Sequence, residues 1–397
     1  MPEPQVTLTP HGTGRLLAGH FWVYRSDIRS AENVEPGDTV CLRDERGRFF
    51  GKAWFSSHSQ IALRLITRED IAIDDDYFRQ RIETAIRFRE RVVENSTAYR
   101  LLYAESDGVP SLVVDRYGET LVMQTLSQAT ERRKADLVRL LQERFSPQAI
   151  VERNDPKVRL LEGLEQRAGV LAGKCEGEVQ ADENGLRFSY DVLHGQKTGA
   201  FLDQRENRLA ASNYAMGEVL DCFCYTGGFA LTAARFVRSV EGIDMSPQAV
   251  AAAQRNAQLN GISNATFREA NAFDVLKQYD DAGRKFDTVI LDPPAFAKNR
   301  ASLPAAQRGY KEINLRALKL LKPGGILVTC SCSHHIPESL LLEIVALRHQ
   351  LLVLQRKVPK AQFSAGDRWP EVGWHSSQVP LGKCSLAFKP DRMQWPL

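Results

Sequence analysis

The sequence of 397 residues lacks the features that mark several specialised classes of protein. No apolar run approaches the roughly 18 residues that a membrane-spanning helix needs. Residues 1–10 lack the basic and apolar segments of a secretory signal peptide, so we expect a cytoplasmic protein with no membrane partner. There is no internal repeat and no low-complexity linker. The composition of the chain is that of an ordinary globular protein, and its length predicts two or three domains.

Cysteine is present, but in patterns that suit neither a metal centre nor disulfides. The seven cysteines include two C-x-C pairs, Cys222 with Cys224 and Cys330 with Cys332. They lack the C-x-x-C spacing and the histidine partners of a zinc module, so we expect reduced thiols and no bound metal. The formal net charge of +3 is small; it permits a nucleic-acid partner without requiring one.

The clearest pattern is a strand, a glycine turn and a helix in residues 219–236. Apolar residues lead to Asp221, a short turn closes on Gly227 and Gly228, and an apolar helical pattern follows. Both the dinucleotide fingerprint G-x-G-x-x-G and the Gly-Lys-Ser/Thr of a phosphate loop are missing. Because no glycine is placed to face a pyrophosphate, we expect an uncharged nucleoside conjugate as the ligand. A bare glycine pair can also be only a turn, so the residues downstream decide.

Three further strands are predicted downstream, each followed by a polar residue. The strand at 239–243 ends at Asp244, about 20 residues beyond the glycine turn, where an acid binds ribose hydroxyls; the alternative is an acidic helix cap. The strand at 265–267 leads to Asn271, at the position expected to contact adenine. The strand at 286–291 runs into Asp292.

The pattern D-x-F-x-Y-x-G-G-F, from Asp221 to Phe229, resembles motif I of class I S-adenosylmethionine (SAM) methyltransferases. The resemblance implies a doubly wound, Rossmann-like α/β domain that binds SAM. It assigns cofactor contacts to Asp221, Phe223, Tyr225, Thr226, Gly227, Gly228, Asp244, Asn271 and Asp292.

A polar, glycine-punctuated segment, residues 194–208, precedes the first strand of this domain. In this topology such a segment can fold over the methionine end of the cofactor, and we expect Gln204 and Arg205 to hold its carboxylate. The alternative is a helix start that is capped by Asp203 and leaves Arg205 exposed.

The first part of the chain, residues 1–72, reads as short strands broken by turn residues and predicts a small β-barrel. The aromatic residues Phe21, Trp22 and Tyr24 lie beside Arg15 and Arg25 in the sequence. This cluster suits stacked bases and phosphates, or else it forms an aromatic core plug. The region resembles a PUA domain, an RNA-binding barrel. We expect a central α+β domain at 73–190, which includes a helix from about 130 to 145, and the methyltransferase domain at 191–397.

The strand at 286–291 opens into the loop Asp292–Pro293–Pro294–Ala295–Phe296. Asp292 can hydrogen-bond a base edge, and Phe296 offers a ring face to a flipped base, unless the loop is only a rigid turn with Phe296 in the core. Residues 297–322 then carry seven basic residues against one acid, a net +6, which is either a solvated helix face or a phosphate contact. The substrate contacts expected here are Pro293, Pro294, Phe296, Lys298 and Arg300.

From end to end the chain resembles PUA-domain-containing 23S rRNA (cytosine-5)-methyltransferases, on residues 195–205, the glycine motif, residues 292–298 and residues 331–335. In RNA cytosine-5 methyltransferases the nucleophile is the seventh residue after the paired glycines, which is Cys332 when counted from Gly325. The resemblance thus assigns catalysis to Cys332 and Asp292, with Cys330 one step deeper on the same face. Many relatives carry a second cysteine where this chain has Ala295, which leaves His334, His335 or water to take the proton.

Two other functions remain open at this point. A guanine-nitrogen rRNA methyltransferase would share the fold and the Asp-Pro-Pro loop but needs no nucleophile. A non-catalytic RNA-binding ribosome-assembly factor would carry a vestigial cofactor site. We expect 23S rRNA as the partner and a homodimer as a candidate assembly; the tail at 362–397 receives no assignment.

Overall fold

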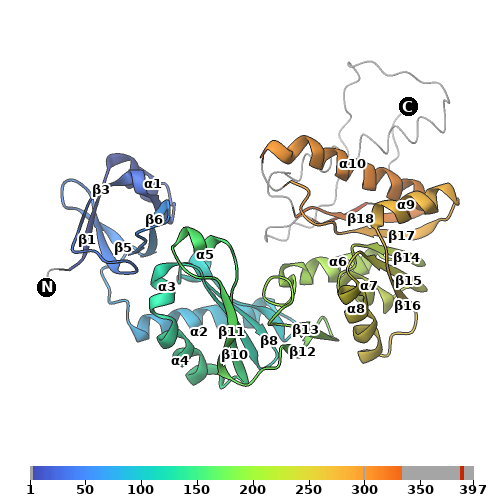
Figure 1. The fold of residues 1–397 in the computed structure, drawn as a ribbon, viewed down its shortest axis with the longest axis horizontal. Coiled ribbons are helices and arrows are strands. Elements are labelled where there is room, and N and C mark those ends of the chain that lie inside the picture. Colours follow the sequence, from blue (N-terminus) through green and yellow to red (C-terminus); the bar gives the residue numbers. More distant parts are fainter. Residues whose placement is uncertain (1–2, 298–299, 333–384, 389–397) are drawn as a thin grey trace, which may run out of the picture. The chain divides into compact units, whose positions relative to one another are not determined.

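In the computed structural model the chain divides into two compact units, Met1–Leu202 and Asp203–Leu397 (Figure 1). The structure describes residues 3–297, 300–332 and 385–388. Within these ranges, no helix combines the length and the hydropathy of a membrane span. The domain boundaries expected near residues 72 and 190 remain predictions.

The first unit opens with a six-stranded sheet in the order β2-β6-β5-β4-β1-β3. Neighbouring strands are antiparallel except β1 and β4, which are parallel. Alternate side chains, such as Val6 and Leu8 of β1, fill its interior. The short elements here are β1 (Gln5–Leu8), α1 (Pro10–Leu17), β2 (Trp22–Tyr24), η1 (Arg25–Asp27), β3 (Ile28–Glu32), β4 (Thr39–Arg43), β5 (Phe49–Phe55) and β6 (Ile61–Thr67).

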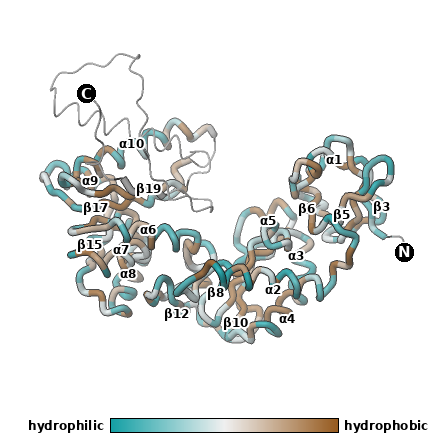
Figure 2. Tube along the Cα trace, turned by 180° about the vertical axis from the view of Figure 1, so that it is seen from behind, coloured by the Kyte–Doolittle hydropathy of each residue, from teal (hydrophilic) through white to brown (hydrophobic). Residues whose placement is uncertain are grey.

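A second sheet in the same unit has the strand order β11-β10-β9-β8-β7, in which only β9 and β10 are parallel. A separate hairpin, β12 with β13, is mostly hydrophilic, whereas β8 is hydrophobic and buried (Figure 2). The elements are α2 (Asp75–Val92), β7 (Ala98–Tyr103), η2 (Ala104–Asp107), β8 (Leu112–Tyr117), β9 (Thr120–Thr125), α3 (Gln128–Arg132), α4 (Lys134–Phe145), β10 (Ala149–Asn154), α5 (Val158–Leu161), β11 (Arg167–Gly173), β12 (Glu178–Glu183) and β13 (Leu186–Asp191).

The two sheets of this unit share a core. Trp54 of β5 and Ile66 of β6 pack in the cluster that α2 forms with the second sheet, and the Trp54 and Phe78 ring centroids lie 6.3 Å apart. A buried ion pair joins Arg64 of β6 to Glu162, with 2.8 Å between Nη2 and Oε1. The first sheet is therefore not an independent module that can be deleted without exposing apolar surface.

The second unit contains a six-stranded sheet in the order β16-β15-β14-β17-β18-β19. The first five strands are parallel, and β19 adds antiparallel to β18 at the edge. In Figure 1, α9 and α10 lie on one side of the sheet and α6, α7 and α8 on the other. The elements are η3 (Leu202–Gln204), α6 (Arg205–Tyr214), β14 (Glu218–Cys222), α7 (Gly228–Ala234), β15 (Ser239–Asp244), α8 (Pro247–Leu259), β16 (Ala265–Glu269), α9 (Ala272–Asp281), β17 (Phe286–Leu291), η4 (Arg300–Ser302), α10 (Leu303–Leu320), β18 (Leu321–Cys330) and β19 (Ser385–Phe388).

The predicted fold class is confirmed: a small N-terminal β-sheet domain, a central mixed α and β region, and a doubly wound sheet with helices on both faces. Two predicted details differ. The helix expected at 130–145 is two helices, interrupted at Arg133. The strand β19 was not predicted.

Candidate active site

The carboxyl ends of the parallel strands gather the predicted cofactor residues at one edge of the sheet. Cys222, at the end of β14, pairs with Ile243 of β15 on one side and with Leu291 of β17 on the other. Asp221, Asp244 and Asp292 therefore lie at three adjacent strand ends. Ligands of open α/β sheets bind at this edge, next to the strand where the order reverses, which here is β14.

The turn after β14 has an unusual backbone. Every second residue is left-handed: φ is +66° at Phe223, +49° at Tyr225 and +88° at Gly227. The first two are not glycines, and such conformations cost about 1–3 kcal/mol each and concentrate at ligand-binding sites. At Gly228 a Cβ would lie only 2.5 Å from Nε of Arg208, so a side chain there would displace the guanidinium. We infer that this turn is shaped for a ligand.

Asp221 lies beneath this turn and is fully buried. Neither carboxylate oxygen has a hydrogen-bond partner among the described residues. Burial, and next the neighbouring Asp292, raise the pKa of Asp221 well above its usual range; the N–H of Ala230 opposes that rise without meeting hydrogen-bond geometry. A buried carboxylate is stabilised when a cation lies close to it. The predicted cofactor fits, because SAM carries an ammonium and a sulfonium.

Asp244 occupies the end of β15 and fixes the glycine turn. One oxygen accepts from the N–H of Tyr225 and the other from the N–H of Ser246, both at 2.9 Å. The side chain that caps α8 is that of Ser246, so Asp244 is not the helix cap of the alternative interpretation. Each carboxylate oxygen keeps a second lone pair that can accept from a ribose hydroxyl.

We expect Asp244→Ala to weaken SAM binding by on the order of 1–3 kcal/mol, because a charge-assisted acceptor is removed. Isothermal calorimetry measures the change, and thermal unfolding checks that the turn survives the loss of its two backbone hydrogen bonds. The exposed Asp274→Ala is a matched control on α9 and should bind SAM as the parent does. An unchanged affinity in Asp244→Ala would remove this residue from the ribose role.

Asn271 lies just beyond β16, at the expected place, but its side chain has a structural partner. The side-chain oxygen accepts from the N–H of Phe273 at 2.9 Å and caps α9. Its amide nitrogen and the second lone pair of that oxygen can still contact a ligand. Thr226 is held through its carbonyl, which accepts from Nδ2 of Asn256 at 3.0 Å.

Gln204 and Arg205 have partners other than the one predicted. Nε2 of Gln204 lies 3.0 Å from both carboxylate oxygens of Asp292, and its Oε1 accepts from Nδ2 of Asn207 at 2.6 Å. The guanidinium of Arg205 pairs with Glu206, and the residue as a whole is 8% exposed. The alternative interpretation was wrong: Gln204 occupies the cap position, no side chain caps α6, and Arg205 is buried. The cofactor roles of Gln204 and Arg205 stay predictions.

The structure brings Cys332 and the Asp292 loop together. Sγ of Cys332 lies 3.4 Å from the carbonyl oxygen of Pro293, to which the thiol donates. Cys332 follows the end of β18 and is half-buried, whereas Cys330, the last residue of β18, is buried. Pro293 is buried and Pro294 is exposed. Lys298, His334 and His335 lie outside the described residues, as does the side chain of Arg300.

The position of Phe296 agrees in part with both interpretations of its ring, as a surface for a flipped base and as part of the core. Its ring packs on Tyr310 at 4.7 Å and near Phe273 at 6.0 Å between centroids, yet it is not fully buried. Gly309 makes room for it, since a Cβ there would lie 3.1 Å from the ring. The ring is thus anchored on the core and keeps some surface that can meet a base.

Several basic side chains of residues 297–322 form ion pairs with acids, which the sequence did not indicate. Lys319 pairs with Asp280, and Lys322 with both Asp287 and Glu218. Arg316 pairs with Glu312 one helical turn away. The expected net charge of +6 is therefore partly neutralised by acids of other segments; Arg308 and Lys311 are exposed on α10.

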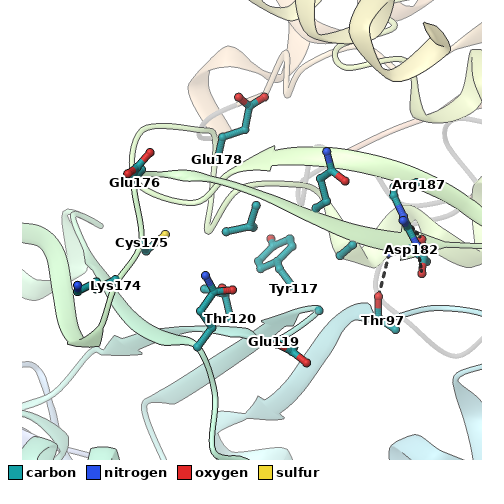
Figure 3. Close-up of a pocket in the computed structure, with 15 residues that line it drawn as sticks. Thr97, Tyr117, Glu119, Thr120, Lys174, Cys175, Glu176, Glu178, Asp182 and Arg187 are labelled. Carbon is teal, nitrogen blue, oxygen red and sulfur yellow. Dashed lines mark hydrogen bonds and ion pairs between the residues drawn. The ribbon is translucent and has the colours of Figure 1, made fainter. Parts of the chain in front are cut away.

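A cavity of about 710 Å³ lies in the first unit, between the β8–β9 turn, the hairpin β12–β13 and residues 174–178 (Figure 3). Acidic Glu119, Glu176 and Glu178 line it beside Lys174, and Asp182 pairs with Arg187. None of the predicted site residues lines this cavity. Its mixed charges favour no particular ligand.

Comparison with known proteins gives two family matches. A family described as S-adenosylmethionine-dependent methyltransferase matches residues 165–368, and a PUA-like domain matches residues 6–68. The chain is 41% identical over 352 residues to ribosomal RNA large subunit methyltransferase I of Shewanella denitrificans, covering 86% of this chain and 89% of the relative. It is 41% identical over 353 residues to the protein of the same name from Vibrio cholerae, with the same coverage.

Solved structures share the fold at low sequence identity. The crystal structure of SMU.776 complexed with SAH has a TM-score of 0.72 at 20% identity and covers 86% of this chain and 89% of that chain. A protein of Streptococcus mutans classed as a SAM-dependent methyltransferase has a TM-score of 0.69 at 19% identity, with the same coverage. At these identities the likeness supports the fold alone.

Proposed function

Because this chain belongs to the ribosomal RNA large subunit methyltransferase I family and is a SAM-dependent methyltransferase with a PUA-like domain, we propose that it methylates carbon 5 of a cytosine in 23S rRNA. The observation that carries the choice of carbon 5 is the Cys332 thiol, half-buried and 3.4 Å from the Asp292 loop. Carbon 5 of a pyrimidine is too weak a nucleophile to take a methyl group unaided. A thiol beside the base-binding loop is what that reaction requires.

The residues of this chain divide the work as follows. The Cys332 thiolate adds to carbon 6, and the electron pair of the 5,6 double bond moves to carbon 5. Asp292 accepts a hydrogen bond from the base edge and holds the ring over the thiol. Bound SAM supplies the methyl group as a sulfonium electrophile, held by the edge that carries Asp221 and Asp244. A base then removes the carbon 5 proton, and the bond from sulfur to carbon 6 breaks. Ala295 cannot serve as that base, so His334, His335 or water remain the candidates.

Product analysis separates this proposal from the guanine-nitrogen alternative. Purified protein, labelled SAM and 23S rRNA should yield 5-methylcytidine after digestion to nucleosides. A methylguanosine would show that the thiol is not a nucleophile. No product, together with no binding of SAM, would favour the non-catalytic assembly factor. The cytoplasmic location and the homodimer stay predictions from the sequence.

The N-terminal sheet offers an aromatic surface suited to RNA. Phe21 is 50% and Trp22 42% exposed, so these residues do not form a core plug. The guanidinium of Arg15 lies 4.6 Å from the Tyr24 ring, and Nε1 of Trp22 donates to Glu105 at 2.8 Å. Exposed rings beside cations can stack bases and contact phosphates. We propose that this surface binds the rRNA.

We expect Phe21→Ala to raise the KM for rRNA about fivefold, because one stacking contact is worth on the order of 1 kcal/mol. The SAM affinity should not change. Leu17→Ala removes a neighbouring exposed aliphatic side chain and serves as the control. A point substitution is preferable to deletion of the sheet, since deletion would remove Trp54 and Ile66 from the shared core. An unchanged KM in Phe21→Ala would show that this surface does not bind substrate.

A further inference from the structure

The contact between Gln204 and Asp292 joins two segments that are 88 positions apart in the chain. Gln204 is the last residue of η3 and directly precedes α6, and Asp292 is the first residue beyond β17. The glutamine side chain is nearly sealed from solvent, at 2% exposure. Its Nε2 is equidistant from Oδ1 and Oδ2 of Asp292, at 3.0 Å each. The amide nitrogen of Gln204 therefore contacts both oxygens of the Asp292 carboxylate equally.

The Asp292 carboxylate fixes which end of the Gln204 amide faces it, and Asn207 is the partner of the other end. Asn207 donates through Nδ2 to Oε1 of Gln204 at 2.6 Å, one helical turn along α6. If the Gln204 amide were reversed, its oxygen would face the two acceptor oxygens of an ionised carboxylate. The network thus has one consistent direction, from Asn207 through Gln204 to Asp292.

This arrangement leaves Gln204 little capacity for a cofactor carboxylate. Its oxygen is occupied by Asn207 and its nitrogen by Asp292, and almost none of its surface is accessible. A carboxylate ligand would have to compete with the Asp292 carboxylate for the same N–H groups. The position suits a residue that acts through Asp292.

We propose that Gln204 is a positioning residue that orients the Asp292 carboxylate toward the base, rather than a ligand of SAM. Its donation fixes the rotation of the carboxylate about its bond to Cβ. It also favours the anion, which must form close to the buried Asp221. An anionic acceptor selects a base edge that presents an N–H donor, such as the amino group of cytosine; only this last step rests on the proposed function.

Two variants and a control test the inference. Gln204→Ala removes the donor, and Gln204→Glu places a second carboxylate against Asp292. Asn213→Asp adds the same charge at an exposed position of α6. The first readout is 13C NMR of protein labelled at aspartate carboxyl carbons, with Asp292→Asn to identify the signal. We expect Asp292 to titrate at higher pH in both Gln204 variants than in the parent or in Asn213→Asp.

The second readout is methylation as a function of pH, together with the Kd of SAM by calorimetry. We expect kcat to fall about tenfold or more in Gln204→Ala while the Kd of SAM stays within twofold. The kcat of Gln204→Glu should recover as the pH falls, because the introduced carboxyl group, once protonated, can donate to Asp292 again. Unchanged titration of Asp292 together with a weakened SAM Kd would overturn the inference and return Gln204 to the cofactor. A methylguanosine product from the parent would contradict the proposed function, whereas the titration of Asp292 would still decide the role of Gln204.

Discussion

Cys332→Ala is expected to abolish methylation of rRNA, by about 10⁴-fold or more, because the reaction loses its nucleophile. The same variant should fail to form a covalent complex with RNA that contains 5-fluorocytosine. In the parent that complex accumulates, since fluorine at carbon 5 cannot leave as a cation and elimination stalls after methyl transfer. Gel electrophoresis under denaturing conditions measures the complex, and calorimetry should show that the variant still binds SAM.

Cys330→Ala is the matched control, two residues earlier on the same segment. Cys330 is buried at the end of β18, so its loss should cost packing, on the order of 1 kcal/mol, and should keep the covalent complex. If Cys330→Ala alone abolishes the complex, the nucleophile is Cys330 and the count from Gly325 is wrong by two residues. If neither variant changes turnover, the covalent mechanism fails and the guanine-nitrogen alternative gains support.

Asp221→Asn is expected to stabilise the protein in the absence of SAM while it weakens SAM binding. The buried carboxylate has no hydrogen-bond partner among the described residues, so its ionisation opposes folding. The asparagine removes that cost, on the order of 1–3 kcal/mol at neutral pH. It also removes the negative charge that the cationic cofactor would meet, so the Kd of SAM should rise.

The pH dependence of this effect has a definite sign. Burial raises the pKa of Asp221 in the folded state above its unfolded value of about 4. The native protein therefore binds the proton more tightly, and the stability of the parent falls as the pH rises from about 4 toward the raised pKa. The advantage of Asp221→Asn should thus grow with pH and vanish in acid. Urea unfolding from pH 4 to 8 measures it, with the exposed Asp274→Asn as control. A variant that is less stable at pH 8 and binds SAM normally would contradict this role.

The parts of the fold that could be predicted are those that local sequence determines. Apolar runs that end at a polar residue gave β14, β15 and β17 together with the acids Asp221, Asp244 and Asp292 at their ends. Family membership, predicted from the motifs, is confirmed by the matched family and relatives.

What could not be predicted depends on contacts between distant segments. The helix at 130–145 breaks at Arg133, whose guanidinium donates to the carbonyl of Gly37 and the hydroxyl of Thr39, more than 90 positions away. β19 forms by antiparallel pairing with β18, a partner that the local sequence of β19 does not indicate. Lys319 and Lys322 looked free in sequence because their acidic partners come from other elements.

The position of Gln204 is the clearest case at the site. Its polar surroundings indicated a functional segment, but nothing local shows that Asp292 is its partner. The one signal available was Asn207, three positions further on and so on the same face of a helix. That spacing could have indicated a side-chain network in place of a direct cofactor contact.

The central claim is that this chain methylates carbon 5 of one cytosine in 23S rRNA through Cys332. The most direct measurement is mass mapping of modified bases in 23S rRNA from a strain that lacks the gene, complemented with the parent or with Cys332→Ala. We predict that one 5-methylcytosine disappears in the deletion strain, returns with the parent and does not return with Cys332→Ala. Loss of a methylguanine instead, or restoration of the 5-methylcytosine by Cys332→Ala, would contradict the claim.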